Sequence, residues 1–282
     1  MEENTVAIIG VGLIGGSMAA RIRSRGLFGR IIGVDNNPDH CEQALELRLV
    51  DEICAIVPAV RAASLVILAT PVDSMLHLLP AILDEVGDQV VMDTGSTKRK
   101  ICEKIKDHHR RGRYVATHPM WGAEFHGPAA ARAESFENRV AVICEHHLSD
   151  TGALQTVRCF YQGMGMRLTE MGSENHDMHT AYISHLPHVI SYALANTVLE
   201  KEVAEDTIFT LASGGFDSTI RLAKSSSTIW TPIFHQNREN IVSVLDEYME
   251  ELQKFRACLI IGNDLDMTRL IDNANIIRKV SK

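Results

Sequence analysis

The sequence lacks several features that mark broad classes of protein. No apolar run approaches the length of a bilayer, and the N-terminus MEENTVAIIG has neither the basic start nor the apolar core of a signal peptide. The formal net charge of -8 argues against a nucleic-acid surface, which needs a basic stripe. We therefore expect a cytoplasmic globular protein with neither a nucleic-acid partner nor a membrane partner.

Cysteine pairs with metal-ligand spacing are also missing. The six cysteines, at positions 41, 54, 102, 144, 159 and 258, include no CxxC pair, which predicts reduced thiols rather than a disulfide framework. Four histidines cluster in HDMHTAYISHLPHVIS as two i,i+3 pairs: His176 with His179, and His185 with His188. That spacing suggests zinc, but neither a cysteine nor an HExxH motif accompanies it, so we expect no metal.

The first part of the chain alternates between two patterns. Short apolar runs predict strands, and the segments between them predict helices; the runs are TVAIIG, RIIGVD, SLVILAT, QVVMDTG, RYVATHP and RVAVICE. Such alternation is typical of βαβ units with a mostly parallel sheet. From about residue 172 only helical periods remain, near 174–200, 203–213, 216–225, 236–261 and 264–280. The sequence therefore predicts an α/β domain over residues 1–172 and a helical domain over 173–282.

A glycine-rich turn follows the first predicted strand. In IIGVGLIGGS, the G-x-G-x-x-G spacing is made by Gly10, Gly12 and Gly15, with Leu13 and Ile14 between the last two. These glycines allow a tight turn, a close approach of the backbone to a pyrophosphate, and close packing of helix on strand. The turn therefore predicts a dinucleotide site, and the alternative is a glycine-rich turn without a ligand.

Polar residues end the following strands. Asp35 ends the second strand near the spacing expected for the acid that binds a ribose 2′-hydroxyl, and it would repel a 2′-phosphate, so NAD is favoured over NADP. Ligands of open parallel sheets bind beyond the carboxyl ends of the strands. We therefore expect Thr70, Pro71, Asp93, Thr94, Gly95 and Ser96 near the nicotinamide or the substrate. The alternative for Ser96 and Thr97 is that they only cap the next helix.

Two histidines stand beside prolines. His118 precedes Pro119 at the end of a short apolar run, and proline holds the residue before it in extended geometry. A catalytic base, a metal ligand and a polar loop residue are the possible roles. Pro187 lies between His185 and His188, so it predicts a kink or a restart of the helix and a site at the head of the helical domain.

Six motifs occur together in one order: GVGLIGGS, ATPV, DTGSTK, THPMWGAE, SHLPH and ASGGFDSTIRLAKSSSTIW. With them the sequence resembles the prephenate dehydrogenase family, which includes arogenate dehydrogenases, over nearly the whole chain. The resemblance implies a Rossmann-type domain followed by an all-helical dimerisation domain. It also implies that prephenate is oxidised with NAD(P) to 4-hydroxyphenylpyruvate and CO2, on the route to tyrosine.

The resemblance implies a role for each matching residue. His118 matches the catalytic histidine, and Ser96 matches the serine that hydrogen-bonds the substrate hydroxyl or that histidine. His188 matches the histidine that contacts the substrate side chain, with Ser184 and His185 nearby. Arg221 matches the arginine that binds a substrate carboxylate, for which a planar guanidinium is suited.

One position departs from the family pattern. Relatives often carry an acid three positions before the arginine, where this chain has Ser218, with Asp217 one residue earlier. Either Asp217 substitutes through a local shift, or Arg221 is oriented by another group.

Other functions remain open. Arogenate is the nearest alternative substrate, alone or together with prephenate as in a cyclohexadienyl dehydrogenase. A β-hydroxyacid dehydrogenase would need a catalytic lysine in the helical domain, and Lys201 comes too late for that role. A non-catalytic NAD-sensing protein would bind NAD without needing His118. The apolar content of the later helices also predicts a homodimer through the C-terminal half.

Overall fold

The computed structural model describes residues 4–205 and 207–279. The chain divides into two compact units, one ending at Asn237 and the other beginning at Arg238.

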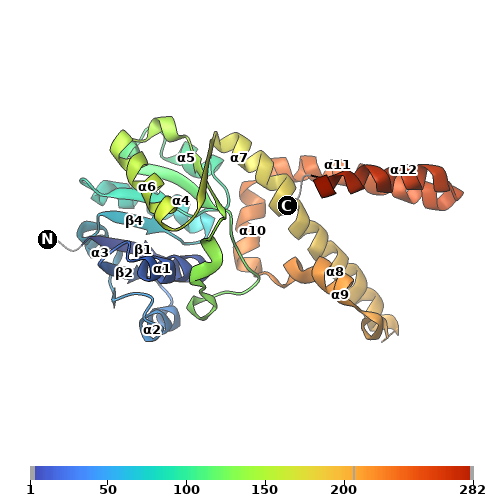
Figure 1. Cartoon of the computed structure of the whole chain (residues 1–282), viewed down its shortest axis with the longest axis horizontal. Coiled ribbons are helices and arrows are strands. Elements are labelled where there is room, and N and C mark those ends of the chain that lie inside the picture. Colours follow the sequence, from blue (N-terminus) through green and yellow to red (C-terminus); the bar gives the residue numbers. More distant parts are fainter. Residues whose placement is uncertain (1–3, 206, 280–282) are drawn as a thin grey trace. The chain divides into compact units, whose positions relative to one another are not determined.

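The first unit is built on one eight-stranded sheet (Figure 1). Its strands are β1 (Thr5–Ile9), β2 (Arg30–Val34), β3 (Glu52–Ile53), β4 (Leu65–Leu68), β5 (Val90–Asp93), β6 (Tyr114–Pro119), β7 (Val140–Cys144) and β8 (Arg167–Met171). The order β3-β2-β1-β4-β5-β6 is parallel throughout and is that of dinucleotide-binding folds. β7 runs antiparallel to β6, and β8 runs parallel to β7. The prediction of a mostly parallel sheet is confirmed.

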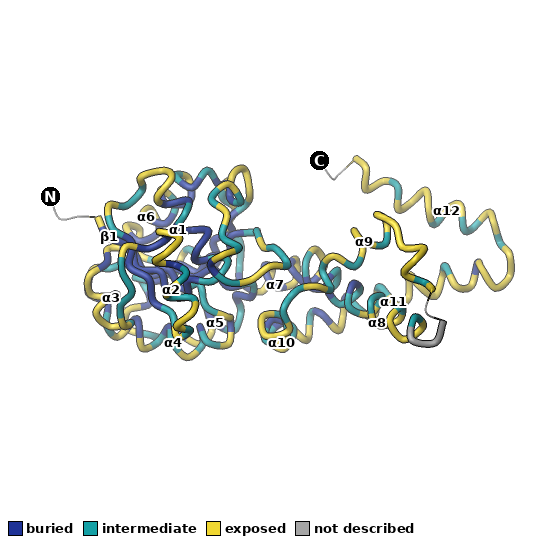
Figure 2. The backbone as a smooth tube through the Cα atoms, turned by 90° about the horizontal axis from the view of Figure 1, so that it is seen from below, coloured by how far each residue is buried: buried dark blue, intermediate teal, exposed yellow. Residues whose placement is uncertain are grey.

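Helices cover both faces of this sheet, because alternate strand residues point to opposite sides. Val6 and Ile8 pack into the core under α1 (Leu13–Arg25) and α6 (Thr151–Gly163). Ala7 and Ile9 pack into the core under α3 (Ile56–Ala62), α4 (Val72–Glu85) and α5 (Arg99–Lys104). Figure 2 shows the strands as the most buried part of the chain. The short α2 (Pro38–Glu46) begins at Asn37, whose side chain caps it.

Some elements were not predicted from the sequence. The alternation pattern missed β3, α3, α6 and β8, and the helix predicted after Gly95 is restricted to α5. The segment STKRKICEKIKDHHRRG predicts a helix with basic residues at its C-terminal end, but the helix ends at Lys104. The last buried residue of this face is Ile105, and the residues after it are mostly exposed. Propensity without an apolar face does not hold a helix on a sheet.

Helices alone follow β8, as predicted. They begin with α7 (Ser173–Thr180), a π-helical turn (Ala181–His185) and α8 (Leu186–Glu205). Pro187 has no N–H to give the preceding turn, so the α-helical pattern restarts beside it, as predicted. The region expected near 203–213 and 216–225 contains the end of α8, two 3-10 turns and α9 (Gly214–Ile220). The sequence reading missed α10 (Ser227–Gln236).

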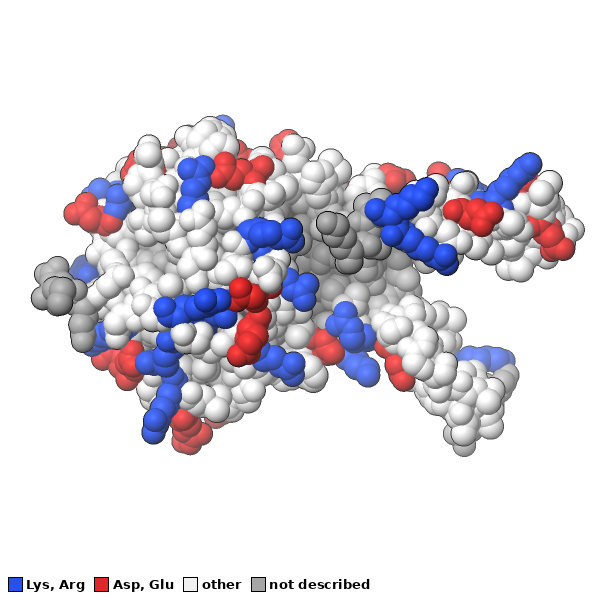
Figure 3. Space-filling model, viewed as in Figure 1, with Lys and Arg blue, Asp and Glu red and all other residues white. Residues whose placement is uncertain are grey.

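The second unit is a helical pair, α11 (Arg238–Ile261) and α12 (Asp264–Asn275), followed by a 3-10 turn (Ile276–Lys279). Gly262 has φ +66° at the turn, and the Asn263 side chain accepts a hydrogen bond of 3.1 Å from the Asp266 amide. Among the described residues, every helix is too short or too polar to span a bilayer. Basic and acidic side chains are interspersed on the face drawn in Figure 3.

A buried ion pair lies at the carboxyl end of β5. The side chains of Asp93 and Lys98 are both fully buried and form a direct ion pair. The Asp93 carboxylate also accepts hydrogen bonds from the Tyr114 hydroxyl (2.7 Å) and from the amides of Gly95 (2.9 Å) and Thr117 (2.9 Å). A buried charge needs such partners, because burial removes its hydration.

We predict that Lys98→Met lowers the free energy of unfolding by about 3–5 kcal/mol, because it leaves the Asp93 carboxylate buried without its cation. Urea unfolding followed by circular dichroism measures the change. Lys254→Met is the matched control, since Lys254 pairs with Glu251 on the surface and its loss should leave the unfolding midpoint unchanged. Equal midpoints for the two variants would contradict this account.

Candidate active site

The glycine turn between β1 and α1 is shaped by contacts and by open space. A Cβ on Gly10, which has φ +95°, would lie 2.6 Å from the Ala69 carbonyl oxygen, and one on Gly15 would lie 1.9 Å from the Gly10 carbonyl oxygen. A Cβ on Gly12 would meet nothing within 4 Å. Leu13 begins α1 directly after Gly12, and Ile14 follows it, so the free N–H groups of the helix face that open space.

Asp35 ties this turn to the end of β2. Its carboxylate accepts hydrogen bonds from the Val11 amide (2.9 Å) and the Asn37 amide (2.9 Å). His40 lies close by, with Nδ1 3.6 Å from Asp35 Oδ2. The carboxylate therefore lies beside the glycine turn, as the spacing predicts; its contact with a ribose remains a prediction.

The ends of β4 and β5 supply groups of two kinds. The buried Thr70 hydroxyl has no hydrogen-bond partner among the described residues, and Pro71 precedes α4 as its N-cap residue. Thr94 and Gly95 instead use their amides inside the protein, on Leu68 and Asp93. The open space at Gly12 and the unpartnered Thr70 hydroxyl fit a dinucleotide laid across the carboxyl ends of the strands.

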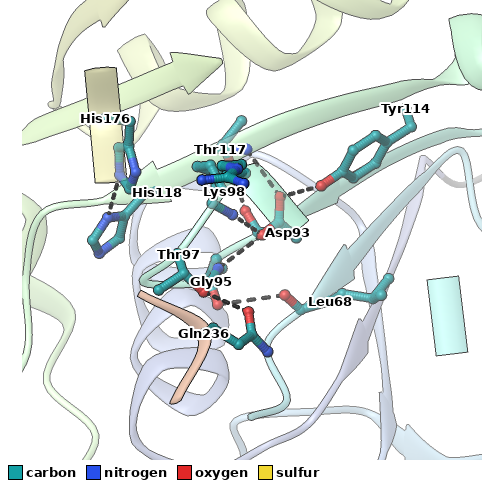
Figure 4. Close-up of polar contacts among 12 residues, drawn as sticks. Leu68, Asp93, Gly95, Thr97, Lys98, Tyr114, Thr117, His118, His176 and Gln236 are labelled. Carbon is teal, nitrogen blue, oxygen red and sulfur yellow. Dashed lines mark hydrogen bonds and ion pairs between the residues drawn. The ribbon is translucent and has the colours of Figure 1, made fainter. Parts of the chain in front are cut away.

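His118 lies on β6 with its neighbour from α7 (Figure 4). Its Nδ1 atom is 2.9 Å from His176 Nε2, and the two rings meet edge to face. Burial lowers the pKa of His118 well below its ordinary value, and the neighbouring His176 acts in the same direction. His118 is therefore neutral near pH 7, the state a general base requires.

The loop after β5 lies beside His118 in the same view. Ser96 is half-buried, and its hydroxyl has no hydrogen-bond partner among the described residues. Thr97 donates instead to Gln236 Oε1 on α10 (2.7 Å). The interpretation that Ser96 and Thr97 cap α5 is wrong, because the Asp177 carboxylate binds the first amides of that helix, those of Lys98 (2.7 Å) and Arg99 (2.9 Å).

His188 lies in an aromatic setting at the start of α8. Its ring stacks on Trp230 of α10 with centroids 3.3 Å apart, and its Nδ1–H donates to the Ser184 carbonyl (2.9 Å). Ser184 thus contributes its backbone here. Burial lowers the pKa of His188 to about 4. His185 is fully buried and accepts from Asn237 Nδ2 (3.0 Å), so it lies inside the protein beside this ring system.

Arg221 is oriented by a glutamate rather than by Asp217 or Ser218. Its Nη1 donates to Glu124 Oε2 at 3.0 Å, and the Ser218 hydroxyl bonds back to the Gly215 carbonyl. The Arg221 side chain is 52% exposed, so further guanidinium donors remain accessible. The question left open by the sequence is settled in favour of Glu124, which belongs to the motif THPMWGAE.

Sequence reasoning gave no role to four residues that contact the predicted ones: Glu124, His176, Asp177 and Trp230. Each stood in a motif or cluster already singled out, but Asp177 and His176 reach the predicted residues only through tertiary contacts, which the sequence does not show. Within the described residues, the one group with metal-ligand proximity is Asp84, His108 and His109, away from the predicted site residues.

Comparison with known proteins identifies the family. Residues 18–170 match the family model of the prephenate dehydrogenase nucleotide-binding domain, and residues 172–273 match that of the prephenate dehydrogenase dimerization domain. Prephenate dehydrogenase from Bacillus subtilis is 32% identical over 259 residues, 90% of this chain and 70% of the relative. Cyclohexadienyl dehydrogenase from Zymomonas mobilis is 31% identical over 257 residues, 90% and 88% of the two chains.

A solved structure of a family member shares the fold over the whole chain. The crystal structure of prephenate dehydrogenase from A. aeolicus in complex with hydroxyphenyl propionate and NAD+ aligns with a TM-score of 0.88 at 26% identity, covering 100% of this chain and 99% of that one.

Two glycine variants separate packing from cofactor binding. We predict that Gly15→Ala lowers the free energy of unfolding by about 1–3 kcal/mol, because its Cβ has no room beside Gly10. Gly12→Ala should leave the unfolding midpoint unchanged and weaken NAD binding by roughly 10-fold or more, because its Cβ enters the space open to the pyrophosphate. Calorimetric titration with NAD and urea unfolding test the pair; unaltered NAD affinity in Gly12→Ala would place the dinucleotide elsewhere.

A second prediction concerns the stability of the protein at low pH. Burial lowers the pKa of His185 to about 4, from an ordinary value of 6.5. Between pH 6.5 and pH 4 His185 binds a proton in the unfolded chain but not in the folded protein. The free energy of unfolding therefore falls as the pH drops from 6.5 to 4, by on the order of 3 kcal/mol. Urea unfolding at pH 7 and pH 4 should show a smaller difference for His185→Gln than for wild type. His109→Gln is the surface control; an identical pH response in both variants would count against the prediction.

Proposed function

The chain belongs to the prephenate dehydrogenase family, and we propose that its reaction is the NAD-dependent oxidative decarboxylation of prephenate to 4-hydroxyphenylpyruvate and CO2, with His118 as the base. The observation that carries this proposal is a neutral, buried histidine on β6, beside the strand ends where the dinucleotide site lies.

The residues of the chain carry out the proton transfer from the substrate hydroxyl. A neutral imidazole accepts the proton of the substrate hydroxyl, and the Ser96 hydroxyl on the neighbouring loop hydrogen-bonds the same group. NAD, held by the glycine turn, Asp35 and the ends of β4 and β5, supplies the hydride acceptor when bound. Loss of the ring carboxylate as CO2 then leaves an aromatic ring.

The charges near the site support an anionic substrate. Arg221 offers its remaining guanidinium donors to a carboxylate, while its Nη1 is held by Glu124. The positive charge of Arg221 also contributes to lowering the pKa of His188. The side chains of prephenate and arogenate both carry a carboxylate that Arg221 can bind, and arogenate adds an ammonium group whose nearest acidic partner, Glu124, is already paired with Arg221. Prephenate is therefore the proposed substrate.

The domain division proposed from the sequence, 1–172 and 173–282, is supported by the family models, which meet between residues 170 and 172. The compact unit nevertheless extends to Asn237, since α7 packs against α5 and α10 against α4. Helices α7 and α10 therefore complete the proposed site.

We also propose a homodimer formed through the helical part. The family model for residues 172–273 is that of a dimerization domain. At the end of α11, Leu259, Ile260 and Ile261 expose 65–73% of their surface, an apolar patch that a partner would cover. A cytoplasmic location is supported by the cysteines, all six of which are free thiols.

The test is absorbance at 340 nm after mixing enzyme with NAD and prephenate, and separately with NAD and arogenate. Reduction with prephenate is expected, and His118→Asn should lower kcat by roughly 10²–10⁴-fold, since it removes the general base. Reduction with arogenate alone would change the substrate but keep the chemistry. Absence of reduction with either substrate and with NAD or NADP would overturn the assignment in favour of NAD sensing.

A further inference from the structure

We propose that Asp177 and His176 are positioning residues that hold His118 as the tautomer protonated on Nδ1, so that its Nε2 presents a lone pair to the substrate. That the proton accepted by Nε2 comes from a substrate hydroxyl depends on the proposed function. The tautomer itself is a property of the free protein and is measurable without any substrate.

The chain of contacts begins at a carboxylate that only accepts hydrogen bonds. Asp177 is 2% exposed, and its Oδ1 and Oδ2 take the backbone amides of Lys98 and Arg99 at the start of α5. His176 Nδ1 lies 2.8 Å from the same Oδ1. Since the carboxylate has no hydrogen to give, His176 Nδ1 must carry a proton and donate it.

His176 then passes this constraint to His118. Burial lowers the pKa of His176, although Asp177 acts in the opposite direction, so the ring is neutral near pH 7 and has one N–H. With that hydrogen on Nδ1, Nε2 of His176 is an acceptor. It lies 2.9 Å from His118 Nδ1, which must therefore be the donor.

The remaining nitrogen of His118 is the free one. A neutral His118 with its hydrogen on Nδ1 has a bare Nε2, and this atom has no hydrogen-bond partner among the described residues. The opposite tautomer would place a hydrogen on Nε2 and could not accept a proton there. Two consecutive hydrogen bonds, from His118 to His176 and from His176 to Asp177, thus determine which neutral tautomer of His118 is present.

The surrounding charges give Asp177 a second effect. Burial and the nearby Lys98 ammonium both disfavour a positive charge on His118. After proton transfer His118 is an imidazolium, and the carboxylate that reaches it through His176 is Asp177. Asp177 is itself fixed, because Asn237 Nδ2 donates to its carbonyl oxygen at 2.6 Å.

The direct test is the tautomer of His118, read from the ring ¹⁵N shifts and ¹⁵N–¹H couplings of histidine-labelled protein without ligands. The wild type should show Nδ1–H. In Asp177→Asn the carboxylate that requires a proton on His176 Nδ1 is replaced by a neutral amide, so a fraction of His118 should appear in the Nε2–H form. His176→Gln keeps an acceptor for His118 and should retain Nδ1–H, whereas His176→Leu should not.

Kinetics separate positioning from binding. His176→Leu and Asp177→Asn should lower kcat for prephenate by roughly 100-fold, with KM nearly unchanged, because the base rather than the binding groups is altered. His176→Gln should recover most of that loss. His179→Gln is the matched control, an exposed histidine on the same helix, and should behave as wild type.

The outcomes distinguish this proposal from the proposed function. An Nε2–H tautomer in the wild type, or an unchanged Nδ1–H signal in correctly folded His176→Leu, would overturn the positioning role even if prephenate is oxidised. If Asp177→Asn fails to fold, the two His176 variants still decide. An Nδ1–H tautomer that depends on His176, in a protein that oxidises neither prephenate nor arogenate, would keep the positioning role and remove the proposed reaction.

Discussion

The structure depends on satisfying one buried charge. Asp93 ends the central strand β5, fully out of water, and an ionised carboxylate in that place requires several donors. Its partners are Lys98, Gly95, Tyr114 and Thr117. They fix the loop that carries Ser96 and the strand that carries His118, since Thr117 is the residue before it. The geometry of the proposed site thus follows from the way the sheet accommodates a buried charge.

Much of the first domain could be predicted from the sequence, because local rules decide it. Three glycines in fixed spacing, an acid at the end of β2 and continuous apolar strands follow from backbone geometry and burial. His118 was singled out for the same reason, since Pro119 fixes its backbone, but its role as base came from the resemblance to the family and remains a prediction. The resemblance to the family then supplied Ser96, His188 and Arg221, whose roles remain predictions.

The contacts between distant segments could not be predicted in this way. Asp177 caps a helix that begins 78 residues earlier in the chain, and no spacing rule connects the two. Glu124 orients Arg221 across a separation of 97 residues. α10 was missed because Pro232 interrupts its helical pattern, and Trp230 on that helix nonetheless stacks on His188. Tertiary packing decides these positions, and local propensity carries little information about them.

The Asp177 carboxylate binds both the start of α5 and the His176 ring, and this shared contact couples the two thermodynamically. Asp177 caps α5 through two amides and also accepts the Nδ1–H of His176. The packing of α7 on α5 and the proposed tautomer of His118 are therefore energetically coupled. Such coupling is reciprocal. Whatever presses α7 against α5 stabilises the Nδ1–H form of His118, which we propose as the reactive form of the base. A ligand that favours that form must in turn tighten the packing of α7 against α5.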